Sequence, residues 1–409
     1  MKKSRPKRRA PQVALLIETS TEYGRGLLRG IVRYSRHHGL WSLYLAPSHL
    51  EKTLPNAGAW HGDGIIARVR SSTTERILRE SGVPFVASNP SESCFPKEDN
   101  VFGEIRTAGE SVACMAATHL AERGLRHFAY CGFSHCQWSA LRERAFIEFL
   151  KGRGFSCATY HVETGGWLQR THWIEAWEHE QPIVTHWLGA LPKPVGIMAC
   201  NDVCGREVLQ ACATGGLHVP DDVAVIGVDN DEMMCELSSP PLSSIALDLE
   251  KAGYTAAGTL DHLMRGRRTR SRIVFVRPTH VATRRSTDFI AQDDPVVAAA
   301  LRIIRDDSRL GIGVTQLVER VGVPRRTLER RFARAVGRSI LGEITGNRIE
   351  QAKRLLLETD LPCYNVGMAV GFGSVKSFTR TFRQNLGCPP ERFRTLSRAA
   401  AAGAKRESW

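Results

Sequence analysis

Six residues in the first 290 positions of this 409-residue chain have the types that bind a polyhydroxylated molecule. Most of them follow a short apolar or β-branched segment directly. Carboxylate and amide oxygens accept hydrogen bonds from hydroxyl groups, arginine donates two in parallel, and an aromatic face covers the C–H surface of a ring. We therefore expect a site for a small polyol or sugar. Its candidate residues are Trp138, Arg142, Asn201, Asp202, Asp229 and Asn230.

The two aspartates also allow a purely structural role. Aspartate is a common helix N-cap, because its carboxylate accepts a hydrogen bond from a backbone N–H in the first turn. Asp202 and Asp229 both precede segments that continue as helices or turns. This alternative stays open for each residue taken singly, whereas several polar strand ends in one chain favour a binding site.

The elements that must position these residues alternate between strand and helix. The predicted strands cover residues 13–18, 41–44, 64–67, 84–87, 127–131, 156–161, 196–199 and 223–228. The predicted helices cover residues 24–37, 104–123, 139–153 and 203–215, with one more around Trp173, Trp177 and Trp187. Such alternation predicts parallel sheets built from βαβ crossovers, whose ligands bind at the carboxyl ends of the strands.

Charge divides the chain into two unlike parts. The formal net charge is +14, and residues 291–409 alone hold 21 basic against 12 acidic residues, while residues 10–290 are close to neutral. A near-neutral body joined to a basic end indicates a polyanion as the partner of that end. On charge alone, a merely solvated basic face is an equal alternative.

The basic end contains one helical pattern twice. The predicted helices cover residues 314–320, 324–335, 339–358, 364–370 and 374–386. Thr315 is the expected cap of the first helix, and Gly322 and Gly371 mark the two tight turns. A glycine turn between two short helices, the second rich in Arg and Lys, is typical of major-groove recognition. Two such pairs joined by one long helix predict a DNA-binding domain.

Residues 196–231 resemble the second lobe of sugar-binding domains of the LacI/GalR family. They read GIMACNDVCGREVLQACATGGLHVPDDVAVIGVDND. The resemblance implies two lobes that are joined by crossover strands and close on a small sugar. It also implies that the segments around Asn201 and Asp229 face that sugar.

The C-terminal region resembles AraC-type DNA-binding domains. Its second helix pair reads AVGFGSVKSFTRTFRQNLGCPPERFR, and the first copy reads VERVGVPRRTLERRFARAVGRSI. The resemblance implies base contacts from both second helices and assigns Leu328, Phe332, Phe378 and Phe382 to the core. Mapped by motif, the residues expected to contact DNA are Arg326, Glu329, Arg330, Val375, Lys376 and Arg380.

The order of the two domains narrows the resemblance. A LacI-like sensor ahead of AraC-type helices, through a junction reading RRSTDF, is similar to the family of xylose operon regulators over nearly the whole chain. That family carries a tyrosine-acidic-arginine segment after the first strand. Here Gly24 takes the acidic position and Glu22 precedes the tyrosine. The resemblance implies that Glu22, Tyr23 and Arg25 also contact the ligand.

The expected fold is an α/β two-lobed sensor domain of the periplasmic-binding-protein type, followed by an all-α AraC-type DNA-binding domain with two helix-turn-helix motifs. The expected parts are a basic disordered tail (1–11), the LacI/GalR-like sugar-binding domain (12–285), a linker (286–294), the DNA-binding domain (295–398) and a flexible tail (399–409).

These inferences predict a sugar-responsive, sequence-specific transcriptional regulator in the cytoplasm that activates a pentose catabolic operon. The expected partners are double-stranded operator DNA, a small sugar with a pentose favoured, a second copy of the chain and RNA polymerase. No apolar run is long enough to span a membrane. The alternative is a cytoplasmic sugar-binding protein, or an enzyme, with an accessory basic helical domain.

Enzyme and metal motifs are missing from the sequence. It contains no GxSxG, Walker or HExxH motif. His172, His179 and His186 recur every seven residues, whereas metal-binding pairs on a helix are spaced three or four residues apart. We therefore expect no catalytic residue, no cofactor and no metal.

Overall fold

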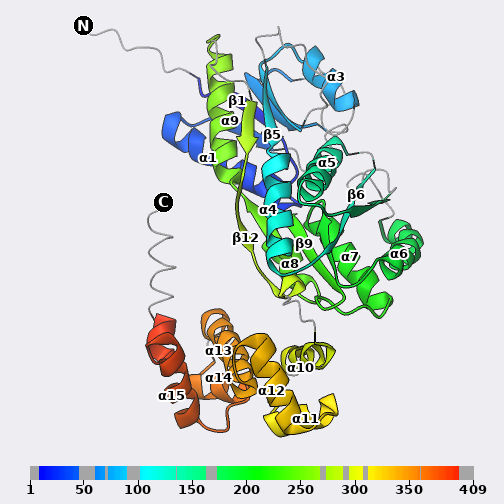
Figure 1. Cartoon of the computed structure of the whole chain (residues 1–409). Coiled ribbons are helices and arrows are strands. Elements are labelled where there is room, and N and C mark those ends of the chain that lie inside the picture. Colours follow the sequence, from blue (N-terminus) through cyan, green and yellow to red (C-terminus); the bar gives the residue numbers. More distant parts are fainter. Residues whose placement is uncertain are drawn as a thin grey trace. The chain divides into compact units, whose positions relative to one another are not determined.

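Figure 1 shows the computed structural model of the chain, which divides into two compact units, Met1–Ile290 and Ala291–Trp409. Among the described residues, no helix has both the length and the apolar composition needed to cross a membrane. Most of the tail 1–11, all of the tail 399–409, the middle of the linker 286–294 and His172 lie outside the described residues. The structure describes residues 9–45, 60–69, 72–89, 102–134, 136–162, 173–267, 273–288, 294–306, 312–359 and 361–395.

Lobe 1 of the first unit is built on a parallel six-stranded sheet of order β11-β5-β4-β3-β1-β2. Helices α1 (Glu22–His38) and α9 (Leu249–Met264) contribute to the core on one face, and α3 (Ser72–Glu80) to the core on the other. The strands are β1 (Gln12–Leu16), β2 (Ser42–Leu45), β3 (Gly64–Arg68), β4 (Phe85–Ser88), β5 (Phe102–Thr107) and β11 (Ile273–Val276).

Lobe 2 has a second six-stranded sheet of order β12-β10-β9-β8-β6-β7, in which only the β10–β12 pair is antiparallel. Its strands are β6 (His127–Phe133), β7 (Cys157–Val162), β8 (Val195–Ala199), β9 (Val223–Asp229), β10 (Ser243–Leu247) and β12 (Pro278–Ala282). Its helices are α4 (Gly109–Glu122), α5 (Gln137–Lys151), α6 (Trp173–Ala190), α7 (Asp202–Thr214) and α8 (Glu232–Leu237), with the 3₁₀ turn η2 (Arg285–Thr287) at the end.

The chain passes between the two lobes three times, from β5 to α4, from β10 to α9 and from β11 to β12. Each passage is a single residue, namely Ala108, Asp248 or Arg277, so three short connections join the described parts of the lobes. The prediction of one helix over residues 104–123 is wrong at its start. Residues 102–107 form β5, which pairs with β4 and β11, and Phe102 and Ile105 are buried. Pairing with two neighbouring strands outweighs the local helical pattern there.

Helices α1 and α9 pack with their backbones in contact. A Cβ atom on Gly30 would lie 2.0 Å from the carbonyl oxygen of Glu250, and one on Gly253 would lie 2.1 Å from that of Leu27. Only glycine fits at such distances. The glycine-rich run GRGLLRG after β1 therefore serves the packing of these two helices.

The second unit contains two small cores that share one long helix. Ile340 and Ile344 near the start of α13 join the core of the first helix pair, and Ile349 and Leu356 join that of the second. Its labelled helices are α10 (Pro295–Asp306), α11 (Val314–Val321), α12 (Arg325–Val336), α13 (Ile340–Glu358), α14 (Cys363–Ala369) and α15 (Val375–Leu386), and residues 390–395 add a short helical turn. Each core therefore positions one helix-turn-helix motif.

Local details of this unit agree with the predictions in all but one position. Leu328, Phe332, Phe378 and Phe382 are fully buried, as expected. Gly322 and Gly371 have φ angles of +74° and +88°, which a tight turn needs and glycine tolerates. The expectation that Thr315 caps α11 is wrong, because Gly313 occupies the N-cap and its backbone N–H donates to Gln316 Oε1 at 2.9 Å.

Candidate functional site

A cavity of about 340 Å³ lies at the carboxyl ends of strands from both lobes. The lobe 1 wall comes from the segment between β1 and α1, and the lobe 2 wall from the segments after β8 and β9. Its lining residues are Ser20, Thr21, Glu22, Asn201, Asp202, Val203, Arg206, Asp229, Asp231 and Met234. Of the six strand-end candidates, Asn201, Asp202 and Asp229 line this cavity, whereas Trp138, Arg142 and Asn230 are not among its lining residues.

Asp229 ends β9 and is the acceptor most available to a ligand. Its Oδ1 is buried and has no hydrogen-bond partner among the described residues. Burial raises the pKa of Asp229 to about 6, although the positive charges of Arg142 and Arg68 oppose the rise. Its φ angle is +104°, a backbone conformation that residues other than glycine rarely adopt. A buried, unpaired carboxylate oxygen on a strained backbone is characteristic of a functional position.

Two arginines supply matching donors. Arg142 on α5 is 3% exposed and donates to the carbonyl oxygen of Cys200, but its Nε has no partner among the described residues. Its guanidinium lies 5.2 Å from the centre of the Trp138 ring. Arg206 on α7 lines the cavity, and its Nε is likewise buried and unpaired within the described part of the chain. The site thus offers one acceptor and two donors.

Tyr23 is buried beside the same region of lobe 1. Its hydroxyl lies 3.2 Å from Ser88 Oγ, and burial raises its pKa. The Arg68 guanidinium lies 4.7 Å from the centre of the Tyr23 ring and forms an ion pair with Glu18. Tyr23 therefore contacts lobe 1 residues, and Asp229 is close enough for its charge to act on the Tyr23 hydroxyl.

Three predicted ligand residues of lobe 2 have side-chain oxygens that accept hydrogen bonds from protein groups. Asn201 caps α7, because its Oδ1 accepts from the backbone N–H of Cys204 at 3.0 Å. Asp202 is fully engaged, with Oδ1 accepting from Ser244 Oγ and Oδ2 from the backbone N–H of Asp231 at 2.7 Å. Burial raises the pKa of Asp202 well above its usual range. The third is Asn230, whose Oδ1 accepts from Arg284 Nη1 at 2.9 Å.

The N-cap alternative is wrong in the residues it named. The caps of α7 and α8 are Asn201 and Asp231, each one residue before the helix begins. Asp202 is already the first residue of α7, and Asp229 is the last residue of β9. The capping role therefore falls on neighbours of the two aspartates.

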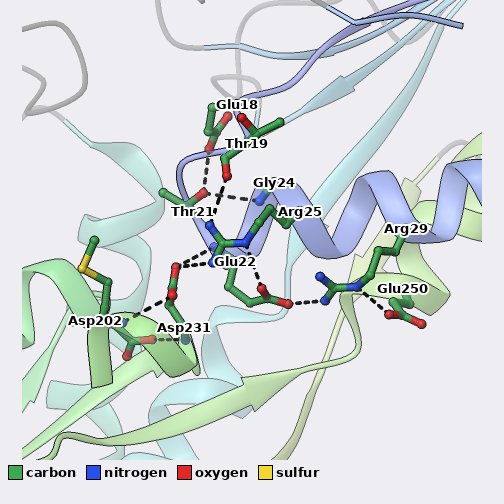
Figure 2. Close-up of polar contacts among 11 residues, drawn as sticks. Glu18, Thr19, Thr21, Glu22, Gly24, Arg25, Arg29, Asp202, Asp231 and Glu250 are labelled. Carbon is green, nitrogen blue, oxygen red and sulfur yellow. Dashed lines mark hydrogen bonds and ion pairs between the residues drawn. The ribbon is translucent and has the colours of Figure 1, made fainter. Parts of the chain in front are cut away.

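Glu22 and Arg25 join the two lobes, as Figure 2 shows. Arg25 Nη2 donates to Asp231 Oδ2 at 2.8 Å, and the backbone N–H of Glu22 donates to the same oxygen at 2.9 Å. Arg25 also contacts Glu22 Oε2 at 3.3 Å, and Arg29 bridges Glu22 and Glu250. These side chains therefore hold Asp231 of lobe 2 against lobe 1 at the rim of the cavity.

Sequence reasoning missed several residues of this region. Arg68 and Ser88 end β3 and β4, so reading every strand end would have found them. Arg206 lies four residues after Asp202 on one helix face, which is also a readable signal. Asp231 follows two residues that were selected, and only the structure reveals that it contacts the other lobe.

The predicted DNA-contacting residues lie exposed on the second helix of each motif. Arg326, Glu329 and Arg330 are on α12, and Arg325 Nε pairs with Glu329 Oε1 at 2.9 Å. Val375, Lys376 and Arg380 are on α15. A shallow hollow on α15 is lined by Lys376, Thr379, Arg380, Arg383 and Gln384. The spacing of Lys376, Arg380 and Arg383 puts them on one face, and Arg383 is a further candidate.

Family models match both units. A periplasmic binding protein-like domain matches residues 117–287, and a model of the XylR N-terminal domain matches residues 12–101. A helix-turn-helix domain matches residues 317–395. The predicted fold class, a two-lobed periplasmic-binding-protein-like sensor followed by a helix-turn-helix domain, is confirmed.

The relatives agree over nearly the full length. The chain is 30% identical to the xylose operon regulatory protein of Escherichia coli (strain K12), covering 94% of this chain and 97% of that protein. The corresponding protein of Haemophilus influenzae (strain ATCC 51907 / DSM 11121 / KW20 / Rd) is also 30% identical, over 94% and 98%. The solved structure of a xylose-binding transcription activator, XylR, matches with a TM-score of 0.78 and 29% identity, over 95% and 99% of the two chains.

These relatives are transcription regulators, and they confirm the prediction of a sugar-responsive, DNA-binding regulator. The similarity covers the sensor, the junction and both helix-turn-helix motifs in the same order. The chain therefore belongs to the family of xylose operon regulatory proteins.

Proposed function

We propose that this chain senses a pentose, with xylose the first candidate, and activates a catabolic operon when the sugar is bound. The observation that carries the sensing half is a set of polar atoms in and beside the cavity that have no partner among the described residues: Asp229 Oδ1, Arg142 Nε and Arg206 Nε. A buried polar atom without a partner costs about 1–3 kcal/mol. Hydroxyl groups of a sugar supply both the donor and the acceptors that these atoms lack.

Each residue has a distinct role in this proposal. Asp229 accepts a hydrogen bond from one sugar hydroxyl, while Arg142 and Arg206 donate to sugar oxygens. Trp138, whose ring Arg142 already contacts, covers the C–H surface of the sugar. Asn201 and Asp202 stabilise the wall of the cavity, because their side-chain oxygens accept hydrogen bonds from protein groups. The contacts of Glu22 and Arg25 with Asp231 hold the two lobes together and exclude water from the cavity.

The DNA-binding half of the proposal places α12 and α15 in successive major grooves of operator DNA. Arg326, Arg330 and Arg380 are suited to bidentate contacts with guanine. Lys376 and Arg383 neutralise phosphates, which makes binding sensitive to salt. Val375, 42% exposed at the start of α15, is suited to an apolar contact with a thymine methyl group.

Regulation follows from coupling the two halves. We propose that the chain acts in the cytoplasm as a homodimer, that the sugar promotes the DNA-competent arrangement, and that the bound activator recruits RNA polymerase. Pairing two domains on a repeated operator raises affinity through effective concentration. The linker in this proposal begins after Thr287, because Ser286 and Thr287 are fully buried in the sensor.

A thermal-shift and calorimetry series tests the sensing half. Xylose, other pentoses, hexoses and sugar acids are compared, and a ligand at a hundred times its Kd should stabilise the protein by about 2.7 kcal/mol. Asp229→Asn should weaken xylose binding, whereas the exposed Arg144→Ala on α5 serves as a matched control. Binding of hexoses alone would contradict the choice of a pentose.

Operator titration tests the other half and separates the alternatives. The full chain should bind its own promoter DNA more tightly than random DNA at the same salt concentration, and xylose should raise that preference. Equal binding to both DNAs, together with tight sugar binding, would favour a sugar-binding protein. Conversion of the sugar to another compound would favour an enzyme.

A further inference from the structure

The end of β9 forms a strained turn at the cavity that is held by groups outside the cavity. Asp229 and Asn230 both have positive φ angles, +104° and +51°. The backbone N–H of Asn230 donates to Ser244 Oγ at 3.0 Å, and its side-chain oxygen accepts from Arg284 Nη1 at 2.9 Å. The conformation of Asp229, the proposed sugar acceptor, therefore depends on partners from β10 and from the segment after β12.

Arg284 connects this turn to three other parts of lobe 2. Its side chain is 13% exposed, and it also donates to the carbonyl oxygen of Leu242 at 3.0 Å and to Glu236 Oε1 of α8 at 2.7 Å. Its own backbone is bonded at both ends to Ser243 Oγ, which accepts from its N–H at 2.7 Å and donates to its carbonyl oxygen at 2.9 Å. Arg284 therefore cannot move independently of the turn.

The residues that follow Arg284 leave the sensor through a buried, fully bonded segment. Ser286 Oγ donates to the carbonyl oxygen of Val225 in β9 at 2.6 Å, and Thr287 Oγ1 donates to Ser243 Oγ at 2.7 Å. His119 Nε2 lies 2.8 Å from Thr287 Oγ1, and Arg123 Nε donates to the carbonyl oxygen of Thr287 at 2.5 Å. Seven residues, 288–294, then separate Thr287 from Pro295, where α10 begins.

Burial fixes the protonation state of His119, which bonds this segment. The pKa of His119 falls to about 4 because the imidazole is buried and the charge of Arg123 lies beside it. Since Thr287 Oγ1 uses its proton toward Ser243, it accepts from His119 Nε2, and His119 Nδ1 accepts from Arg123 Nη1 at 3.1 Å. The side chains of Ser286, Thr287 and His119 thus each have defined partners, which makes this segment a stiff attachment point.

We infer that Arg284, through Asn230, transmits the state of the sugar site to the start of the linker that leads to the DNA-binding domain. This inference rests on the proposed function. Asp231, next to the turn, bonds Arg25 and Glu22 of lobe 1, so the turn senses whether the lobes are closed. A sugar that binds Asp229 favours one position of the turn, and Arg284 carries that position to η2. Differential affinity for the two positions is all that the coupling needs.

The test compares operator affinity with and without xylose in the full chain and in Asn230→Ala, Arg284→Lys and the double variant. Asn230→Ala removes only the side-chain amide. Arg284→Lys keeps the positive charge, but lysine cannot reach all three acceptors of Arg284, on Asn230, Leu242 and Glu236. Arg265→Gln is the matched control, because Arg265, the C-cap residue of α9 in lobe 1, is also ion-paired, to Asp261 at 2.8 Å. Xylose affinity of every variant is measured by calorimetry.

In the wild type and the control, xylose should change operator Kd by about tenfold or more. In both single variants and the double variant, the ratio of the two operator Kd values, without and with xylose, should fall to about twofold or less, while xylose still binds. If Arg284 and Asn230 were merely structural, the variants would change in stability or xylose affinity, but xylose would still change operator Kd as it does in the wild type. Such an unchanged effect of xylose on operator Kd would overturn the inference. Loss of the ratio in the wild type itself would instead overturn the proposed function.

Discussion

In the sensor, the polar side chains around the cavity are buried and largely bonded to one another, whereas on α12 and α15 they stand exposed. Asp202, Asn230 and Asp231 each bond at least two groups of the protein. Arg326 and Arg380 lie on the outer faces of their helices and need no partner until DNA arrives. A buried site must satisfy its own polar groups, so substitutions there affect folding as well as binding.

The largest expected effect is that of Arg142→Ala. It removes a buried donor to the Cys200 carbonyl and the positive charge that lowers the pKa of Asp229. We expect a loss of about 3–5 kcal/mol in the free energy of unfolding, together with loss of xylose binding. Urea unfolding and calorimetry measure both, and Arg144→Ala on the exposed face of α5 should change stability by less than about 0.5 kcal/mol. Equal free energies of unfolding for Arg142→Ala and Arg144→Ala would contradict the contrast between buried and exposed positions.

Asp229→Asn is expected to act on folding and binding in opposite directions. Burial raises the pKa of Asp229 to about 6, so the folded state binds its proton more tightly than the unfolded state, and ionisation destabilises the fold as pH rises through 6. The amide should therefore stabilise the sugar-free protein at pH 7 by about 3 kcal/mol. This gain should shrink as pH falls from 6 and vanish near 4.

The same variant should bind xylose more weakly by about 1.5–3 kcal/mol, because it replaces a charged acceptor by a neutral one. Urea unfolding between pH 4 and 8 and calorimetry at pH 7 follow the two effects. A gain in stability that does not change with pH would contradict the raised pKa of Asp229, and unchanged xylose affinity would show that Asp229 is not the ligand acceptor.

On the exposed side, Arg326→Ala and Arg380→Ala should each weaken operator binding by about 1–3 kcal/mol and relax base preference at one position. Neither should change the free energy of unfolding by more than about 0.5 kcal/mol, because neither side chain is buried. Fluorescence anisotropy on single-base operator variants gives the preference. A uniform loss on all sequences would assign that arginine to phosphate instead.

The smallest expected effect is that of Glu329→Gln. Glu329 pairs with Arg325 one helical turn away, and an exposed pair of this kind is worth about 0.2–0.5 kcal/mol. We expect changes of that size in stability and little change in operator affinity. A loss of 1 kcal/mol or more that is confined to one cytosine-containing position would establish base recognition by Glu329.

The contrast also explains how far sequence reasoning reached. Strand ends and helix-turn-helix spacing depend on nearby residues, so they located the cavity and both recognition helices. Which polar groups bond one another depends on distant partners. Ser244 lies 42 residues from Asp202, and Arg284 lies 54 residues from Asn230. No local pattern indicates such pairs, so the bonds that engage Asp202 and Asn230 within the protein could not be predicted from the sequence.

Strand β5 was misassigned for the same reason. Its partners β4 and β11 begin at Phe85 and Ile273, and the second of these lies far along the chain. The contact of Asp231 with lobe 1 was missed because it joins residues more than 200 positions apart in the sequence. Interactions within one turn of helix or at the end of one strand were predictable, and those that bring two distant segments together were not.

The three passages of the chain between the lobes also govern the order in which the protein takes shape on the ribosome. The core of lobe 1 combines Val13 and Ile31 with Leu260 and Val276, so its sheet cannot be completed until β11 has emerged. At roughly 5–20 residues per second, the stretch from Thr107 to Val276 takes about 8–34 s to synthesise. During this time β5 has an unpaired edge and the α1 face has no α9 to cover it. Both lobes are then completed almost together by β11 and β12, whereas the DNA-binding helices, which pack on near neighbours in sequence, fold as they appear.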